Sequence, residues 1–252
     1  MVLTAKWKLG LLMWGAGMLG VLAMAGLLLP RLLAMMPELL GKAEPLPLPV
    51  PVLILASVAQ TGLFLALAVW GGVALSPSAG LHAPAFEAVV GRQPVWPALR
   101  PQVVPGVVAG LIGGLGLFAF GWFAPPQIQA AQARVVMPLP VRILYGGITE
   151  EVLLRWGFMT LLVWLGWRLL GRRHSAAWMW GSIVVSAVVF AIGHLPAAHL
   201  FMGPMSATVI AYVIAGNALF GIVFGVLYRR YGLEAAILAH ALTHVVAWSL
   251  SS

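Results

Sequence analysis

The feature that most constrains this chain is a succession of apolar runs, each long enough to cross the hydrocarbon core of a bilayer. Such a crossing takes about 20 helical residues. We predict membrane-spanning helices at residues 9–29, 51–76, 105–124, 141–168, 176–197, 205–228 and 232–250. The predicted fold class is therefore all-α: a polytopic membrane helical bundle of about seven helices, within a range of six to eight. The proline-rich and aromatic stretches 77–104 and 125–138 are expected to hold interfacial or re-entrant helices, and 31–49 is the clearest polar connection.

The composition agrees with a membrane location. Hydrophobic residues make up 62% of the 252 residues and charged residues only 8%, whereas about a quarter of a soluble domain is charged. The net charge of +8 follows from Lys and Arg at the ends of membrane spans, so the expected partner is the lipid bilayer and not nucleic acid. The chain has no Cys, which excludes disulfides and thiolate chemistry. No repeat or second domain is visible, and residues 1–252 are read as a single integral membrane domain of the cell membrane.

The placement of Lys and Arg predicts the orientation of the bundle, because cytoplasmic loops carry more of these residues than outer loops. With a cytoplasmic N-terminus, nine basic residues lie on the inner side and four on the outer side. The inner set is Lys6, Lys8, Arg92, Arg100, Arg168, Arg172, Arg173, Arg229 and Arg230, and the outer set is Arg31, Lys42, Arg134 and Arg142. Seven spans then place the C-terminus outside.

Three charged residues lie close together inside the fourth predicted span, in "EEVLLR". A charge at mid-bilayer costs about 3 kcal/mol on insertion scales, so these side chains need compensation. Glu151 and Arg155 are four residues apart and share a helix face, which predicts an ion pair. Glu150 points about 100° away and is expected to face the bundle interior. An unpaired carboxylate in that position favours a functional site over simple packing.

Other polar residues fall within the last three spans. His194 lies near the end of the fifth, Asn217 within the sixth, and His240 and His244 are one helical turn apart on the seventh. Together with the two glutamates they predict one site built from several helices. By contrast, His82, His174 and His199 are read as solvated residues in loops or at the membrane surface.

Two glycine patterns predict close helix packing. Gly106, Gly110 and Gly114 lie at four-residue intervals on the third span, and Gly221 and Gly225 repeat the interval on the sixth. Small residues at this spacing let helix backbones approach closely within a membrane. We therefore interpret both patterns as packing surfaces.

Three motifs in this order resemble those of a known family. "EEVLLR" carries Glu150, Glu151 and Arg155, "FAIGH" carries Phe190 and His194, and "HALTH" carries His240 and His244. They resemble EExxxR, FxxxH and HxxxN of the CPBP family, which comprises CAAX-type prenyl proteases and bacteriocin-processing or Abi proteins. The resemblance covers about residues 140–248, the expected catalytic core, whereas the first 130 residues carry no motif.

The resemblance implies an intramembrane glutamic endopeptidase that cleaves a membrane-associated or lipidated peptide or protein with an activated water and without a cofactor. A carboxylate held away from water is a stronger base, and peptide hydrolysis also needs donors for the developing oxyanion. By this resemblance Glu150 is the general base, Glu151 a second polarising carboxylate held by Arg155, and His194 a residue that orients the water. His240 and His244 would face the carbonyl oxygen, with Phe190 and Asn217 in supporting positions.

The chain departs from the family at His244, where the pattern has Asn. An imidazole N–H can also donate to an oxyanion, but the HxxxH pair suits two ligands of one metal. A metal-dependent membrane hydrolase is therefore the main alternative, with Glu150, His194, His240 and His244 as candidate ligands of Zn or Fe. The absence of HExxH weakens that reading. A non-catalytic membrane peptide binder or transporter would use the same buried Glu and His residues.

Overall fold

In the computed structural model the chain is a bundle of helices, and the structure describes residues 2–39, 48–134 and 136–251. Within these residues, seven helical stretches are long and apolar enough to cross a membrane, which confirms the predicted multi-pass all-α bundle. They are Thr4–Met36, Val50–Ala79, Val95–Gly121, Leu139–Leu169, Ala176–Met202, Ala207–Tyr231 and Leu233–Ser251.

Two predicted boundaries were wrong. The first span runs from α1 (Val2–Ala23) through a π-helical turn η1 (Met24–Leu28) into α2 (Leu29–Leu39), so residues 31–39 are helical instead of a polar connection. Of the rest of that predicted connection, residues 40–47 lie outside the described residues, and Leu48 and Pro49 are not helical. The third span begins at Val95, ten residues before the predicted start. Pro97 occupies its first turn, where no N–H bond is lost, and transmembrane helices tolerate internal prolines such as Pro101 and Pro105.

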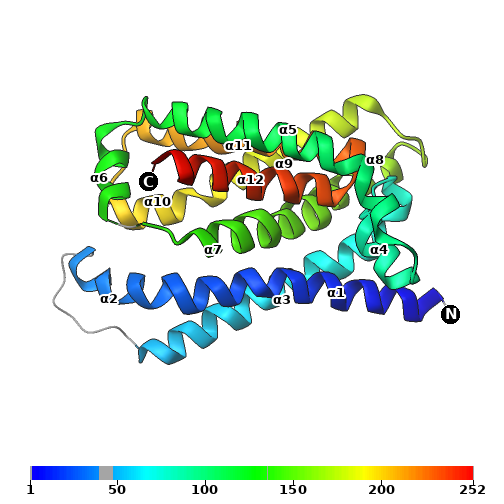
Figure 1. Ribbon diagram of the computed structural model, residues 1–252, viewed down its shortest axis with the longest axis horizontal. Coiled ribbons are helices and arrows are strands. Elements are labelled where there is room, and N and C mark those ends of the chain that lie inside the picture. Colours follow the sequence, from blue (N-terminus) through cyan, green and yellow to red (C-terminus); the bar gives the residue numbers. More distant parts are fainter. Residues whose placement is uncertain (1, 40–47, 135, 252) are drawn as a thin grey trace.

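The long helices lie side by side along one axis (Figure 1). Helices α1 and α3 (Val50–Ala79) form one side of the bundle, and α5 (Val95–Gly121), α9 (Ala176–Gly193), α11 (Ala207–Tyr231) and α12 (Leu233–Ser251) form the other. The fourth span lies between them and contacts both α1 and α12. The N- and C-termini lie at opposite ends of the long axis, as an odd number of spans requires. We call these the N-terminal end and the C-terminal end of the bundle.

The glycine patterns are packing surfaces, as predicted. A side chain added at Gly110 would come within 2.7 Å of Leu242 Cβ, and one at Gly114 would collide with Val246, so α5 and α12 pack backbone to backbone. On α11, a side chain at Gly221 would lie 2.8 Å from Ala187 Cβ of α9. Since α12 carries His240 and His244 and α9 ends beside His194, these contacts fix the helices that carry the site.

The fourth span contains π-helical stretches, which the sequence did not predict. After the short helix α7 (Leu139–Val141), η2 covers Arg142–Glu150, η3 covers Val152–Met159, and α8 (Thr160–Leu169) completes the span. The N–H of Thr160 reaches back to the carbonyl of Arg155, five residues earlier, and its hydroxyl donates to the same carbonyl at 3.2 Å. π-Helical turns occur frequently at functional sites. Here they contain Glu150 and Arg155 and flank Glu151.

Short helices lie at both ends of the bundle. The interrupted stretches 77–104 and 125–138 contain α4 (Pro84–Gly91) and α6 (Pro126–Arg134), and α10 (Leu195–Met202) follows α9. The buried Glu234, in the first turn of α12, accepts hydrogen bonds from the N–H groups of Ala85 at 2.7 Å and Phe86 at 2.9 Å. This carboxylate satisfies the free N–H groups at the start of α4 and attaches that helix to α12.

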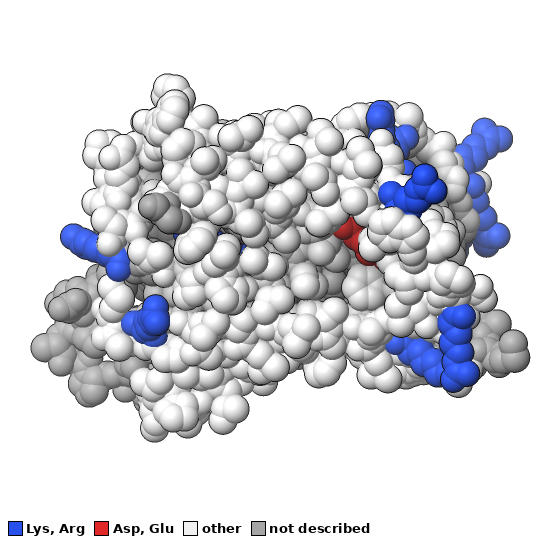
Figure 2. Space-filling view, in the orientation of Figure 1, with Lys and Arg blue, Asp and Glu red and all other residues white. Residues whose placement is uncertain are grey.

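Basic side chains gather at the two ends of the molecule on the face shown in Figure 2. The band between the ends is almost free of charge, which matches a hydrocarbon-spanning region. More basic side chains are visible at the N-terminal end, the side predicted to be cytoplasmic. Lys42, counted above on the other side, lies outside the described residues.

Candidate active site

A cavity of about 650 Å³ contains most of the predicted site residues. Glu150, His194, Asn217, His240 and His244 all line it, although they come from four different spans. Its remaining wall is mainly apolar and includes Met24, Leu117, Leu153, Leu154, Val189 and Phe220. Glu150, which the helix geometry placed toward the interior of the bundle, lines this cavity, whereas Glu151 is not among its lining residues.

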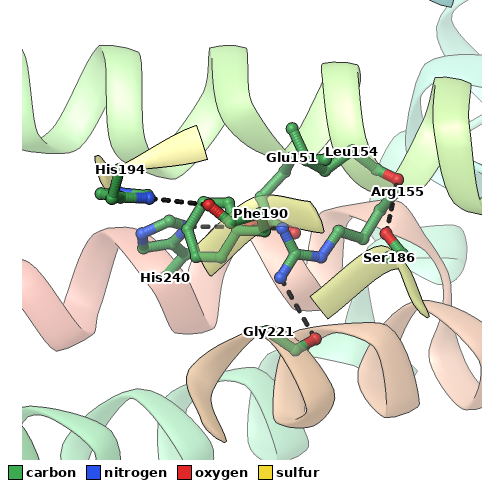
Figure 3. A network of polar contacts seen from close by, with 8 residues as sticks. All are labelled: Glu151, Leu154, Arg155, Ser186, Phe190, His194, Gly221 and His240. Atoms are coloured by element: carbon green, nitrogen blue, oxygen red, sulfur yellow. Dashed lines mark hydrogen bonds and ion pairs between the residues drawn. The ribbon is translucent and has the colours of Figure 1, made fainter. Parts of the chain in front are cut away.

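Glu151 lies behind the cavity wall and holds two other residues (Figure 3). Its side chain is fully buried, and its Oε1 lies 2.8 Å from His240 Nδ1 and 3.2 Å from Arg155 Nη1. The predicted ion pair with Arg155 is thus present. Arg155 also donates through Nη2 to the carbonyl of Gly221 at 3.1 Å, which ties the fourth span to α11. Glu151 orients His240 from behind and does not itself reach the cavity.

The hydrogen bond of His194 determines its tautomer. His194 Nδ1 lies 2.8 Å from the backbone carbonyl of Phe190, and a carbonyl oxygen can only accept. Nδ1 therefore carries the hydrogen, and in the neutral ring Nε2 keeps its lone pair. Because His194 lines the same cavity as Glu150, this nitrogen is available as a proton acceptor there.

His244 has a different environment. Its Nδ1 is buried and has no hydrogen-bond partner, whereas its Nε2 lies over Gly146, 3.0 Å from where a Cβ would be. His240 Nε2 lies 3.6 Å from the same point. A buried N–H without an acceptor is costly, so the proton of His244 is better placed on Nε2. Gly146 leaves room at the point where the two Nε2 atoms converge.

Aromatic rings enclose the charged groups. Phe224 stacks on His240 with 4.5 Å between ring centroids, and Phe190 meets His194 edge to face at 4.7 Å. Arg155 Cζ lies 4.8 Å from the centroid of Phe190 and 5.6 Å from that of Phe224, within cation–π range. Phe190 is thus a wall residue, as expected, and the rings shield the ion pair of Arg155 from the cavity.

Several contributing residues were not predicted from the sequence. Arg142, Tyr145 and Thr243 line the cavity, and Thr149 donates to the carbonyl of Gly17 at 2.6 Å, which fixes η2 against α1. Arg142 precedes Glu150 by eight residues, about two helical turns. This spacing could have predicted from the sequence that the two side chains lie on the same side of the helix. Asn217 lines the cavity while its amide donates to Val213 O at 2.9 Å. His82, His174 and His199 are exposed, as expected.

The candidate metal ligands do not form a metal site in the part of the chain that the structure describes. No three His or Glu side chains there are placed to hold one ion. A metal-bound imidazole usually donates its second N–H to an acceptor. His194 and His240 have such acceptors, but His244 Nδ1 has none. The geometry therefore fits His194 and His240 as two oriented imidazoles and His244 as a free N–H donor better than it fits the three as ligands of one metal ion.

Comparison with protein families identifies the motif-bearing segment. Residues 132–246, slightly under half of the chain, match the family described as type II CAAX prenyl endopeptidase Rce1-like. This segment is Rce1-like, which agrees with the resemblance predicted from the three motifs. Comparisons with curated proteins and with solved structures each found no match.

Proposed function

We propose that this chain is an intramembrane endopeptidase that cleaves a peptide bond near a lipidated or membrane-associated terminus with a glutamate-activated water. The observation that carries the proposal is the separation of the two glutamates. Glu150 lines the cavity with His194 and His240, whereas Glu151 is buried behind His240 with Arg155. One carboxylate is thus free to act on a bound water, and the other has a positioning role.

In the proposed mechanism, Glu150 and His194 hold the attacking water. A water molecule can donate one hydrogen to the Glu150 carboxylate and the other to His194 Nε2, whose lone pair faces the cavity. Glu150 takes a proton as the water attacks the scissile carbonyl, and returns it to the leaving amine. The apolar wall keeps other water away and strengthens these interactions.

The developing oxyanion is assigned to the two imidazoles of α12. The Glu151 carboxylate accepts from His240 Nδ1 and orients the ring, and a doubly protonated His240 donates through Nε2 to the carbonyl oxygen. His244 Nε2–H is the second donor, in the place where the family pattern has Asn. Both atoms lie above Gly146, where a substrate carbonyl has room. This mechanism uses no metal.

The test is cleavage of a farnesylated CAAX peptide by the protein in lipid nanodiscs. We expect Glu150→Gln to lose at least about 100-fold in turnover while it still binds the peptide. The matched control is Glu87→Gln, because Glu87 is a half-exposed glutamate outside the cavity, and this variant should cleave normally. Near-normal turnover by folded Glu150→Gln protein would overturn the mechanism. Binding without cleavage by the wild-type chain would instead favour the peptide-binder alternative.

Glu150, His194 and His240 are expected to act as a unit. Loss of one member of such a unit is nearly as damaging as loss of all, so His194→Ala, His240→Ala and the triple variant with Glu150→Ala should have similar residual rates. Single-turnover measurements at saturating peptide check this. If the individual losses multiply in the triple variant, the three residues act independently and the shared-water arrangement is wrong.

A further inference from the structure

One charged residue of the cavity has no role in the proposed mechanism. Arg142, the first residue of η2, lines the same cavity as Glu150, the last residue of that stretch. None of the ion pairs among the described residues involves Arg142, and no other Lys or Arg lines the cavity. A basic side chain near a membrane surface commonly extends toward water. Here it lines the wall of the cavity that contains the site.

The guanidinium of Arg142 is held in a defined orientation. Its Nε donates to the carbonyl of Met137 at 3.0 Å, and Met137 also lines the cavity. This bond leaves both terminal NH₂ groups for a ligand. Two such groups match the two oxygens of a carboxylate, and the paired geometry gives both strength and directional preference.

The distance from Arg142 to Glu150 fits a short peptide tail. They are the first and last of the nine residues of η2, so they are separated by about 12 Å or less along the helix axis. An extended peptide covers at most about 3.3–3.6 Å per residue. A carboxylate bound at Arg142 therefore leaves room for a tail of only a few residues between it and the peptide bond beside Glu150.

We propose that Arg142 binds the free C-terminal carboxylate of the peptide substrate and so measures the distance from the chain end to the cleaved bond. This assignment rests on the proposed peptidase function. Arg142 is a specificity residue under this proposal, and it takes no part in proton transfer.

The test compares two farnesylated CAAX peptides, one with a free C-terminal carboxylate and one with a C-terminal amide. Binding to nanodisc-embedded protein and cleavage are both measured, so binding is assessed even if no cleavage occurs. We expect the wild type to bind the carboxylate form about 10- to 100-fold more tightly than the amide. Arg142→Gln should remove that preference by weakening binding of the carboxylate form alone, and Arg142→Lys should keep only part of it. Arg134→Gln is the control, because Arg134 is an exposed arginine near the same end of the bundle and outside the cavity.

The outcomes separate the two proposals. Equal affinity of the wild type for both peptides, or equal weakening of both by Arg142→Gln, would overturn the carboxylate assignment; the second result would indicate a lipid or structural role for Arg142. A carboxylate preference without any cleavage would keep the binding site and contradict the peptidase. A peptide lengthened by two C-terminal residues provides a further check. The cleaved bond should move two residues with the new chain end in the wild type and lose this dependence in Arg142→Gln.

Discussion

At the scale of single residues, the buried ion pair of Glu151 and Arg155 predicts that substitutions of the two residues are coupled, which would not follow if the side chains only filled space. Arg155→Leu leaves the fully buried Glu151 without its cation, a change that costs about 3–5 kcal/mol in comparable buried pairs. Replacing both residues, as Glu151→Gln with Arg155→Leu, removes the unpaired charge. We therefore expect more folded protein from the double variant than from Arg155→Leu, measured by size-exclusion chromatography and thermal unfolding in detergent. No recovery would show that the coupling between these two side chains is small.

His244 allows a test between the metal-free and metal-dependent mechanisms. If its Nε2–H donates to the oxyanion, His244→Asn supplies an amide N–H and should keep substantial activity, with little effect of chelators. His244→Ala lacks any donor and should lose roughly 100-fold or more. Cleavage rates and metal content of the purified variants are the measurements. An inactive His244→Asn variant that has also lost bound metal would favour the metal-dependent alternative.

At the scale of helices, the position of α12, which carries His240 and His244, depends on its close approach to α5. A side chain at Gly110 would lie 2.7 Å from Leu242 Cβ and 3.1 Å from the carbonyl of Ala239, the residue before His240. Gly110→Leu should therefore displace α12, lower the midpoint of thermal unfolding and reduce cleavage. Gly116→Leu is the matched control on the same helix, since nothing lies within 4 Å of its added Cβ. Similar loss of activity in both variants would mean that the effect comes from the helix itself and not from this contact.

The seven spans could be predicted from the sequence because hydropathy depends only on local composition. The pairing of Glu151 with Arg155 was also predictable, since four-residue spacing on a helix survives most packing arrangements. The contact of Glu151 with His240 was not, because it joins positions 89 residues apart through the packing of two helices. The π-helical backbone of η2 and η3 also has no simple sequence signature. The family resemblance assigned Glu151 as a second polarising carboxylate of the site, whereas the structure places it behind His240, outside the cavity lining.

At the scale of the whole molecule, the cavity lies in the half of the bundle that is nearer its C-terminal end. Its wall includes Met137, which precedes the fourth span, and Ala197, which follows α9, and both segments lie at the C-terminal end. The other half is closed by fully buried side chains such as Trp156 and Tyr228, whose hydroxyl pairs with Thr160 at 2.8 Å. The cavity therefore extends away from the N-terminal end. If that end is cytoplasmic, as the placement of Lys and Arg predicts, peptides reach the site from the outer face.

Cysteine labelling can test this orientation cleanly, because the chain has no Cys of its own. Met137→Cys places a thiol in the cavity wall at the C-terminal end, and His174→Cys places one in the exposed connection between α8 and α9 at the N-terminal end. A maleimide that does not cross membranes should label Met137→Cys in intact cells and label His174→Cys only after permeabilisation. Excess farnesylated CAAX peptide should slow labelling of Met137→Cys, since the peptide would occupy the same cavity. The reverse pattern of labelling would place the cavity on the cytoplasmic side and show that the count of basic residues does not set the orientation of this bundle.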